Sequence, residues 1–153
     1  MKRLLLIFLT ITLVFSACGR KEKDANINTV ADAVLEALDT KEGLTLADED
    51  FAETNFTCDD EIEECKIYLG EEREIGILRL DDDGNAAVTE RAIKEYLQSE
   101  ASSITSLLEL YPSEVLEERL THYQNATVAQ KGRYICYFAL PKAEAEKALA
   151  EMG

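Results

Sequence analysis

The 153-residue chain has no tryptophan and a single histidine, His122. Ser-His-Asp and Cys-His chemistry would depend on that one residue, and no serine lies in a G-x-S-x-G turn. The sequence also has no H-E-x-x-H segment, no paired C-x-x-C and no Walker A loop. Without tryptophan and with few other aromatic residues, the sugar-stacking groove of a glycosidase is not expected. We therefore predict a protein without catalytic activity or cofactor, and interpret His122 as a helix-end or loop residue.

Basic residues are scarce beyond the first 23 positions. From residue 24 onward, 11 Lys and Arg stand against 30 Asp and Glu, which leaves a net charge of −19. Such a chain is repelled by anionic membranes, teichoic acids and nucleic acids. The charge balance therefore excludes nucleic acid as a partner.

The one long apolar run lies at the N-terminus, from Leu4 to Phe15, after the basic residues Lys2 and Arg3. Twelve helical residues span about 18 Å, whereas the hydrocarbon core of a membrane is about 30 Å thick. The run is too short for an ordinary membrane span, and its length is typical of a signal-peptide core. We predict that residues 1–17 are a signal peptide.

The apolar run ends in Phe15-Ser16-Ala17-Cys18-Gly19, which resembles a lipobox, the cleavage site of bacterial prolipoproteins. Small residues before the cysteine let the backbone enter a peptidase cleft, and the Cys18 thiol accepts the diacylglyceryl group. Phe15 departs from the usual leucine. The alternative is ordinary secretion, with cleavage after Ala17 and an unmodified thiol. We predict an exported protein that lipid on Cys18 anchors to the outer face of the cell membrane, since two or three acyl chains anchor firmly.

The predicted mature chain has a tether and one domain. Residues 18–25 are the lipidated cysteine and a polar tether, whose Arg20, Lys21 and Lys23 would lie among anionic head groups. Residues 26–153 are long enough for one domain with a modest core. An apolar content of 46% argues against intrinsic disorder.

Three cysteines remain after Cys18. Cys136 lies in the apolar run Tyr134–Phe138, which predicts a buried and inert thiol. Cys58 and Cys65 flank six residues, and outside the cytoplasm they can form a disulfide. Closing that loop would stabilise the fold by roughly 2.5 kcal/mol. The alternative is two free thiols.

Hydrophobic periodicity and turn residues predict the element order α-ββ-α-α-ββ-α. Thr29 is the predicted cap of the first helix, and Pro112 ends the long one. The apolar stripe expected on the long helix comprises Ile93, Leu97, Ala101, Ile104, Leu108 and Tyr111. The elements expected after the first helix are a helical turn around Asp50–Thr54, strands Lys66–Leu69 and Glu74–Leu80, helices Ala86–Tyr111 and Ser113–Leu120, strands Ala126–Gln130 and Tyr134–Leu140, and a helix Lys142–Met152.

This order predicts the fold class. Two hairpins, each followed by a helix, favour a small single α+β domain with about four mainly antiparallel strands. We expect the helices to pack on one face of that sheet.

Three short segments resemble domain-of-unknown-function family 4358. They are Glu74-Ile75-Gly76-Ile77 before a long helix, the Tyr111-Pro112 stop, and Gly132-Arg133-Tyr134 opening an apolar strand. The resemblance covers about residues 30 to 152. It implies a small lipoprotein of a Gram-positive, largely anaerobic bacterium, and it implies no catalytic residues because the family has no assigned activity. The Cys58/Cys65 pair and the acidic segment are not features of that family.

Acidic residues gather in two segments. Nine acids and no base occupy Asp48–Glu64. In the second segment, an EF-hand interpretation would make Asp81, Asp83 and Glu90 calcium ligands. Arg79 then takes the first position, where an aspartate is required. We instead interpret the second segment as a strand-to-helix turn whose acids favour the positive end of a helix, and we expect no metal site.

The sequence thus leads to three functional hypotheses. The first is a lipid-anchored, non-enzymatic binding or interaction domain at the cell envelope, with another envelope protein as a partner. The second is a divalent-cation-binding or envelope-sensing module that uses the acidic segments. The third is an envelope hydrolase.

Overall fold

The computed structural model describes residues 25–38 and 42–151. The predicted signal peptide, residues 1–17, and the predicted lipid site, Cys18, lie outside the described residues.

The described chain contains five α-helices, five strands and one short 3-10 turn. In chain order they are α1 (Ile27–Ala37), β1 (Thr45–Leu46), α2 (Phe51–Asn55), the turn η1 (Asp59–Glu61), β2 (Ile62–Leu69), β3 (Glu74–Leu80), α3 (Ala86–Leu110), α4 (Glu114–Gln124), β4 (Thr127–Lys131), β5 (Tyr134–Ala139) and α5 (Lys142–Glu151).

The strands form one antiparallel sheet in the order β1-β2-β3-β5-β4. The two predicted hairpins, β2–β3 and β4–β5, are present, and β3 joins them by pairing with β5, with Ile77 opposite Cys136. The sheet has five strands rather than about four because Thr45 and Leu46 pair with the end of β2. The predicted α+β class and single domain are confirmed.

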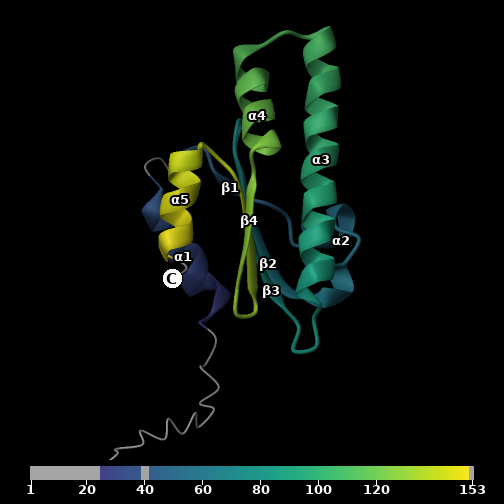
Figure 1. Cartoon of the computed structure of the whole chain (residues 1–153). Helices are drawn as coiled ribbons and strands as arrows, with labels where there is room; N and C mark the ends of the chain where they lie inside the picture. Colours follow the sequence, from purple (N-terminus) through teal and green to yellow (C-terminus); the bar gives the residue numbers. More distant parts are fainter. Residues whose placement is uncertain (1–24, 39–41, 152–153) are drawn as a thin grey trace, which may run out of the picture.

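The helices lie on both faces of the sheet, so the expectation that they cover one face was wrong. Figure 1 shows α1 and α5 on one side of the strands and α2 and α3 on the other. Tyr123 places α4 with α2 and α3, because it belongs to the same core as Ala52 and Leu97. The reason is that β5 is buried along its whole length and β3 nearly so. A strand that is apolar on both faces needs a covering layer on each.

Alternating residues of β3 and β5 therefore belong to two separate cores. Ile75 and Ile77 point to the α1/α5 side, and Leu78 points to the α3 side. The core under α1 and α5 comprises Ile27, Ala31, Val34, Leu38, Ile75, Ile77, Tyr134, Cys136, Phe138, Leu140, Ala145 and Ala148. The core under α2, α3 and α4 comprises Ala52, Phe56, Cys58, Ile67, Leu78, Leu80, Ala92, Ile93, Leu97, Ile104, Tyr123, Ile135, Tyr137 and Ala139.

Asparagine side chains start two of the helices. Asn26 caps α1 by accepting from the Asn28 amide at 2.8 Å. The helix thus begins before the predicted cap Thr29, which lies inside its first turn. Asn85 caps α3 by accepting from the amides of Ala87 and Val88, at 3.1 and 3.3 Å. Asparagine is among the best capping residues because its oxygen satisfies amides that lack a helical partner.

Strand β2 begins four residues before its predicted start. Its acidic first half, Glu63 and Glu64, did not indicate a strand in the sequence. In the structure both carboxylates contact Arg79 of β3, at 3.1 and 2.8 Å. Opposite charges across neighbouring strands stabilise their pairing, so these acids are accommodated in the sheet.

Helices α3 and α4 form an antiparallel hairpin that extends beyond the sheet (Figure 1). The described chain enters the domain at the other end, where the Tyr134 hydroxyl donates to the Ala25 carbonyl. With 25 residues, α3 is about 37 Å long. Among the described helices, none is both long enough and apolar enough to cross a membrane.

Candidate functional site

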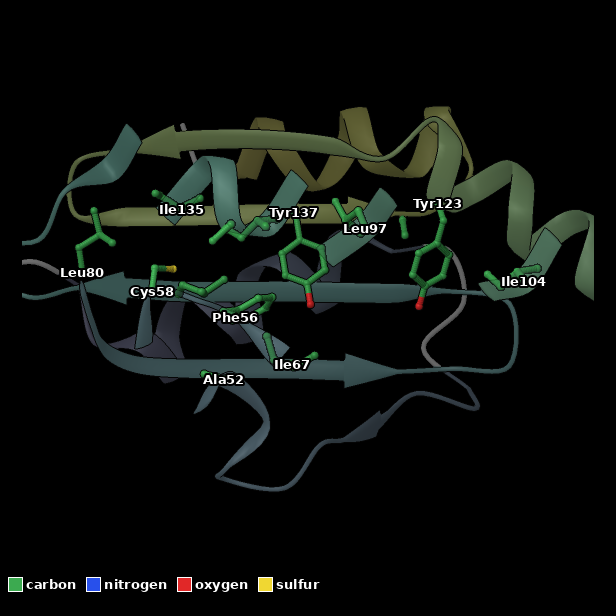
Figure 2. Close-up of a cluster of buried hydrophobic side chains, with 14 residues drawn as sticks. Ala52, Phe56, Cys58, Ile67, Leu80, Leu97, Ile104, Tyr123, Ile135 and Tyr137 are labelled. Carbon is green, nitrogen blue, oxygen red and sulfur yellow. The ribbon is translucent and has the colours of Figure 1, made fainter. Parts of the chain in front are cut away.

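A buried carboxyl group lies where the hairpin meets the sheet. Glu74, the first residue of β3, is 1% exposed. Three tyrosine hydroxyls donate to its two oxygens: Tyr96 of α3 at 2.9 and 3.0 Å, Tyr123 of α4, and Tyr137 of β5. Figure 2 shows Tyr123 and Tyr137 pointing in the same direction along the core. One carboxyl group therefore connects β3, β5, α3 and α4.

The electrostatics of this cluster follow from burial. Desolvation raises the pKa of Glu74, the three tyrosine hydroxyls lower it, and the nearby negative charge of Glu100 raises it further, with a net rise. Burial and Glu74 likewise raise the pKa of Tyr96, Tyr123 and Tyr137. The tyrosines therefore remain protonated and act as donors to the carboxyl group.

The environment of this carboxyl group favours a structural role over a catalytic one. A hollow of about 420 Å³ lies between α3, the end of α4 and β4. Tyr123 lines it, but Glu74 does not belong to the described lining. Arg119 lies over the Tyr123 ring, 5.4 Å from its centre, and pairs with Glu100 at 3.8 Å. A general acid must reach its substrate, and here the tyrosines cover Glu74.

His122 lies in the last turn of α4, as the helix-end interpretation predicts. It is 7% exposed, and its Nδ1 lies 2.8 Å from the Glu72 carbonyl oxygen. Its Nε2 is 4.0 Å from a carboxylate oxygen of Glu118. The contact with Glu72 joins the end of α4 to the β2–β3 turn, whereas Glu118 lies on α4 itself.

The candidate metal ligands lie at one end of the domain, and the free end of the α3–α4 hairpin lies at the other. Asp81 and Asp83 line a hollow of about 440 Å³ together with acids from η1 and β2. Glu90 is not in that described lining and pairs with Lys94 at 2.5 Å. The structure therefore brings two of the three candidates together and separates the third.

Arginine side chains form ion pairs with some of the acids at this end of the domain. Arg133 reaches Glu63 at 2.6 Å and Asp82 at 3.2 Å. Arg79, which takes the first position of the EF-hand interpretation, forms ion pairs with Glu63 and Glu64. Within residues 25–38 and 42–151, no group of three or more His, Cys, Asp or Glu is placed to hold a metal ion.

The described cysteines differ in exposure. Cys136 is fully buried, and burial raises the pKa of its thiol to about 12, as the predicted inert thiol requires. Cys58 is buried and Cys65 is a half-buried free thiol. Burial also raises the pKa of Cys65. The Cys58–Cys65 disulfide stays a prediction for the oxidised protein.

The end of the helical hairpin presents exposed apolar side chains. We call residues 105–118 the hairpin tip. Within it Leu107 is 45% exposed, Leu110 is 71% exposed and Tyr111 is 68% exposed; Leu46 is the other large hydrophobic residue that is exposed in the described chain. Tyr111 was predicted to lie on the buried stripe of α3, and that prediction was wrong. Helix α4 covers one side of α3, where Leu108 is partly buried.

The tip could have been found in the sequence by helical geometry. Leu107, Leu108, Leu110 and Tyr111 cover a sector of about 160° around α3, since each residue turns the helix by about 100°. One neighbouring helix buries only one stripe. The Glu74 cluster gave a weaker signal, because its four residues are scattered over residues 74 to 137.

Comparison of the chain with protein-family models, curated proteins and solved structures finds no match.

Proposed function

We propose that this protein is a lipid-anchored binding domain at the outer face of the cell membrane of a Gram-positive-type bacterium, non-enzymatic, with an envelope protein as its partner. The observation that carries the binding role is the hairpin tip. Leu107, Leu110 and Tyr111 leave apolar area exposed to water at the end of the α3–α4 hairpin. Contiguous exposed apolar area on a folded domain is typical of an interaction site.

The placement of the tip supports this role. The lipid site, Cys18, precedes Ala25 by seven residues, and seven extended residues reach at most about 25 Å. Ala25 accepts a hydrogen bond from Tyr134, which pairs with Arg79 near the end of β3 that leads to α3. An anchored domain can therefore present the tip on the side away from its lipid, toward other envelope components.

Anchoring is tested by replacing Cys18 with alanine in the producing bacterium. Wild-type protein should fractionate with membranes and carry a diacylglyceryl group on Cys18, detected by mass spectrometry. Cys18→Ala should give an unprocessed precursor or protein released into the medium. Cys65→Ala is the matched control and should leave anchoring intact. Wild-type protein without lipid would contradict the anchored role.

A further inference from the structure

We infer that the hairpin tip binds a cationic, amphipathic polypeptide segment, one that presents apolar side chains flanked by lysine or arginine. This inference rests on the proposed binding role and specifies the chemistry of the partner. It starts from the composition of the tip. Residues 105–118 contain no lysine or arginine, but they contain the four acids Glu109, Glu114, Glu117 and Glu118.

The hairpin tip carries exposed acids on both of its helices, in addition to its apolar residues. Glu109, Glu114 and Glu117 are exposed and take part in none of the ion pairs among the described residues. Two bases of the hairpin lie outside the tip and form ion pairs there, Lys94 with Glu90 and Arg119 with Glu100. The hairpin tip therefore combines exposed apolar side chains with exposed glutamates that form no ion pair within the part of the chain that the structure describes.

This charge pattern favours some binding partners of the hairpin tip over others. A second copy of the chain would place acids against acids, which disfavours self-association through the tip. Anionic lipids and nucleic acids are repelled for the same reason. A polypeptide with apolar side chains between cations satisfies both features of the surface, because it covers Leu110 and Tyr111 and also pairs with the glutamates.

The test uses the mature chain, residues 18–153, with Cys18→Ser so that no lipid is attached. The probe is a synthetic helical peptide of leucine and lysine with all leucines on one face. A fluorescently labelled probe should bind in an anisotropy titration, and added salt should weaken the binding. The double variant Leu110→Ser/Tyr111→Ser should lower the affinity about tenfold or more, as expected when central apolar contacts are removed. An all-lysine peptide of equal charge should bind more weakly than the probe.

Charge is tested separately. Glu109→Gln/Glu114→Gln should also lower the affinity for the leucine–lysine peptide. The matched control, Asp81→Asn/Asp83→Asn, removes the same charge at the far end of the domain and should leave the affinity unchanged. Equal losses in both pairs would show diffuse attraction and overturn the inference.

Two further readouts keep the inference falsifiable. In the wild-type chain, peptide-induced amide shifts in NMR spectra should map to residues 105–118; shifts confined to other residues would contradict the inference. Sedimentation should show a monomer, and a dimer that Leu110→Ser/Tyr111→Ser dissociates would identify a second copy as the occupant. Peptide binding can persist where no lipid is found on Cys18, so failure of anchoring and failure of this inference are distinguishable.

Discussion

Glu74 makes the stability of the domain depend on pH. Its pKa is raised in the folded state, mainly by burial. The folded protein therefore binds a proton more tightly than the unfolded chain does. The contribution of this proton to the free energy of unfolding is fully present below the ordinary pKa of a glutamate. It is lost as the pH rises through the raised pKa of Glu74.

We expect the free energy of unfolding of the wild type to fall with rising pH across that window, relative to Glu74→Gln. The glutamine has no charge to desolvate, so the variant should lack this component. Urea unfolding at a series of pH values measures the difference. Glu71→Gln, at an exposed position of the β2–β3 turn, is the matched control and should follow the wild type. Parallel profiles for wild type and Glu74→Gln would contradict the prediction.

Gly76 is the second residue on which the buried cluster depends. A Cβ atom at this position would lie 1.8 Å from Cε1 of Tyr137, the residue opposite it on β5. Tyr137 is fully buried, so the ring cannot move into solvent. We expect Gly76→Ala to lower the free energy of unfolding by about 3 kcal/mol, the upper end of the usual cost of overpacking.

Gly132→Ala provides the comparison for Gly76→Ala in denaturant unfolding. A Cβ at Gly132 meets no atom within 4 Å, but the residue has φ +56°. Gly132→Ala should therefore lower the free energy of unfolding only through the strain of an alanine in the left-handed region, about 1 kcal/mol. If Gly76→Ala lowers the free energy of unfolding no more than Gly132→Ala does, β3 and the Tyr137 ring can move apart to make room for the added Cβ atom.

At the scale of elements, helix α3 depends on its cap. The Asn85 side chain accepts from two amides of the first turn. Asn85→Ala should lower the free energy of unfolding by about 1 kcal/mol, since those amides lose their acceptor. Thermal and urea unfolding measure the change. Asn85→Ser should retain most of the stability, and exposed Asp83→Ala should have an effect within about 0.5 kcal/mol. An unchanged stability in Asn85→Ala would show that water replaces the cap.

Elements with a regular apolar period were predictable from the sequence, and those stabilised by specific partners were not. The period of α3 and the stop at Pro112 placed that helix to within one residue of its observed end. The first half of β2 escaped prediction because it is acidic and depends on Arg79, which is distant in sequence. The Glu74 cluster escaped for the same reason, since three tyrosines converge on it only after folding.

The arrangement of helices on the two faces of the sheet was partly predictable from the sequence. The runs Ile75–Leu80 and Tyr134–Ala139 have almost no polar residue at alternating positions, which indicates burial on both faces. This pattern predicts a helical layer on each face of the sheet. The order of the elements, two hairpins each followed by a helix, led instead to the expectation of a single layer. Which helices cover which face depends on the pairing of β3 with β5, and that contact is not visible in local sequence patterns.

At the scale of the whole molecule, the acidic surface should attract divalent cations weakly and diffusely. A tight calcium site needs six to eight oxygens around one ion. Here Glu90 is separated from Asp81 and Asp83, and Arg133 occupies part of the acidic end. Calorimetric titration of the full mature chain with calcium at moderate ionic strength should show no stoichiometric site, and residual heat should fade with added salt. Stoichiometric micromolar binding that Asp83→Ala abolishes would favour the cation-binding hypothesis instead.

The position of β5 determines when the fold can be completed during synthesis. β5 is the last strand in the chain, yet it lies between β3 and β4, and α1 packs against α5 at the opposite end of the sequence. A chain that emerges N-terminus first cannot close its sheet until residues 134–139 are free. Its first helix cannot complete its layer until residues 142–151 follow. Such non-local pairing is slow to form, so the sheet of a nascent chain remains incomplete until β5 has been synthesised.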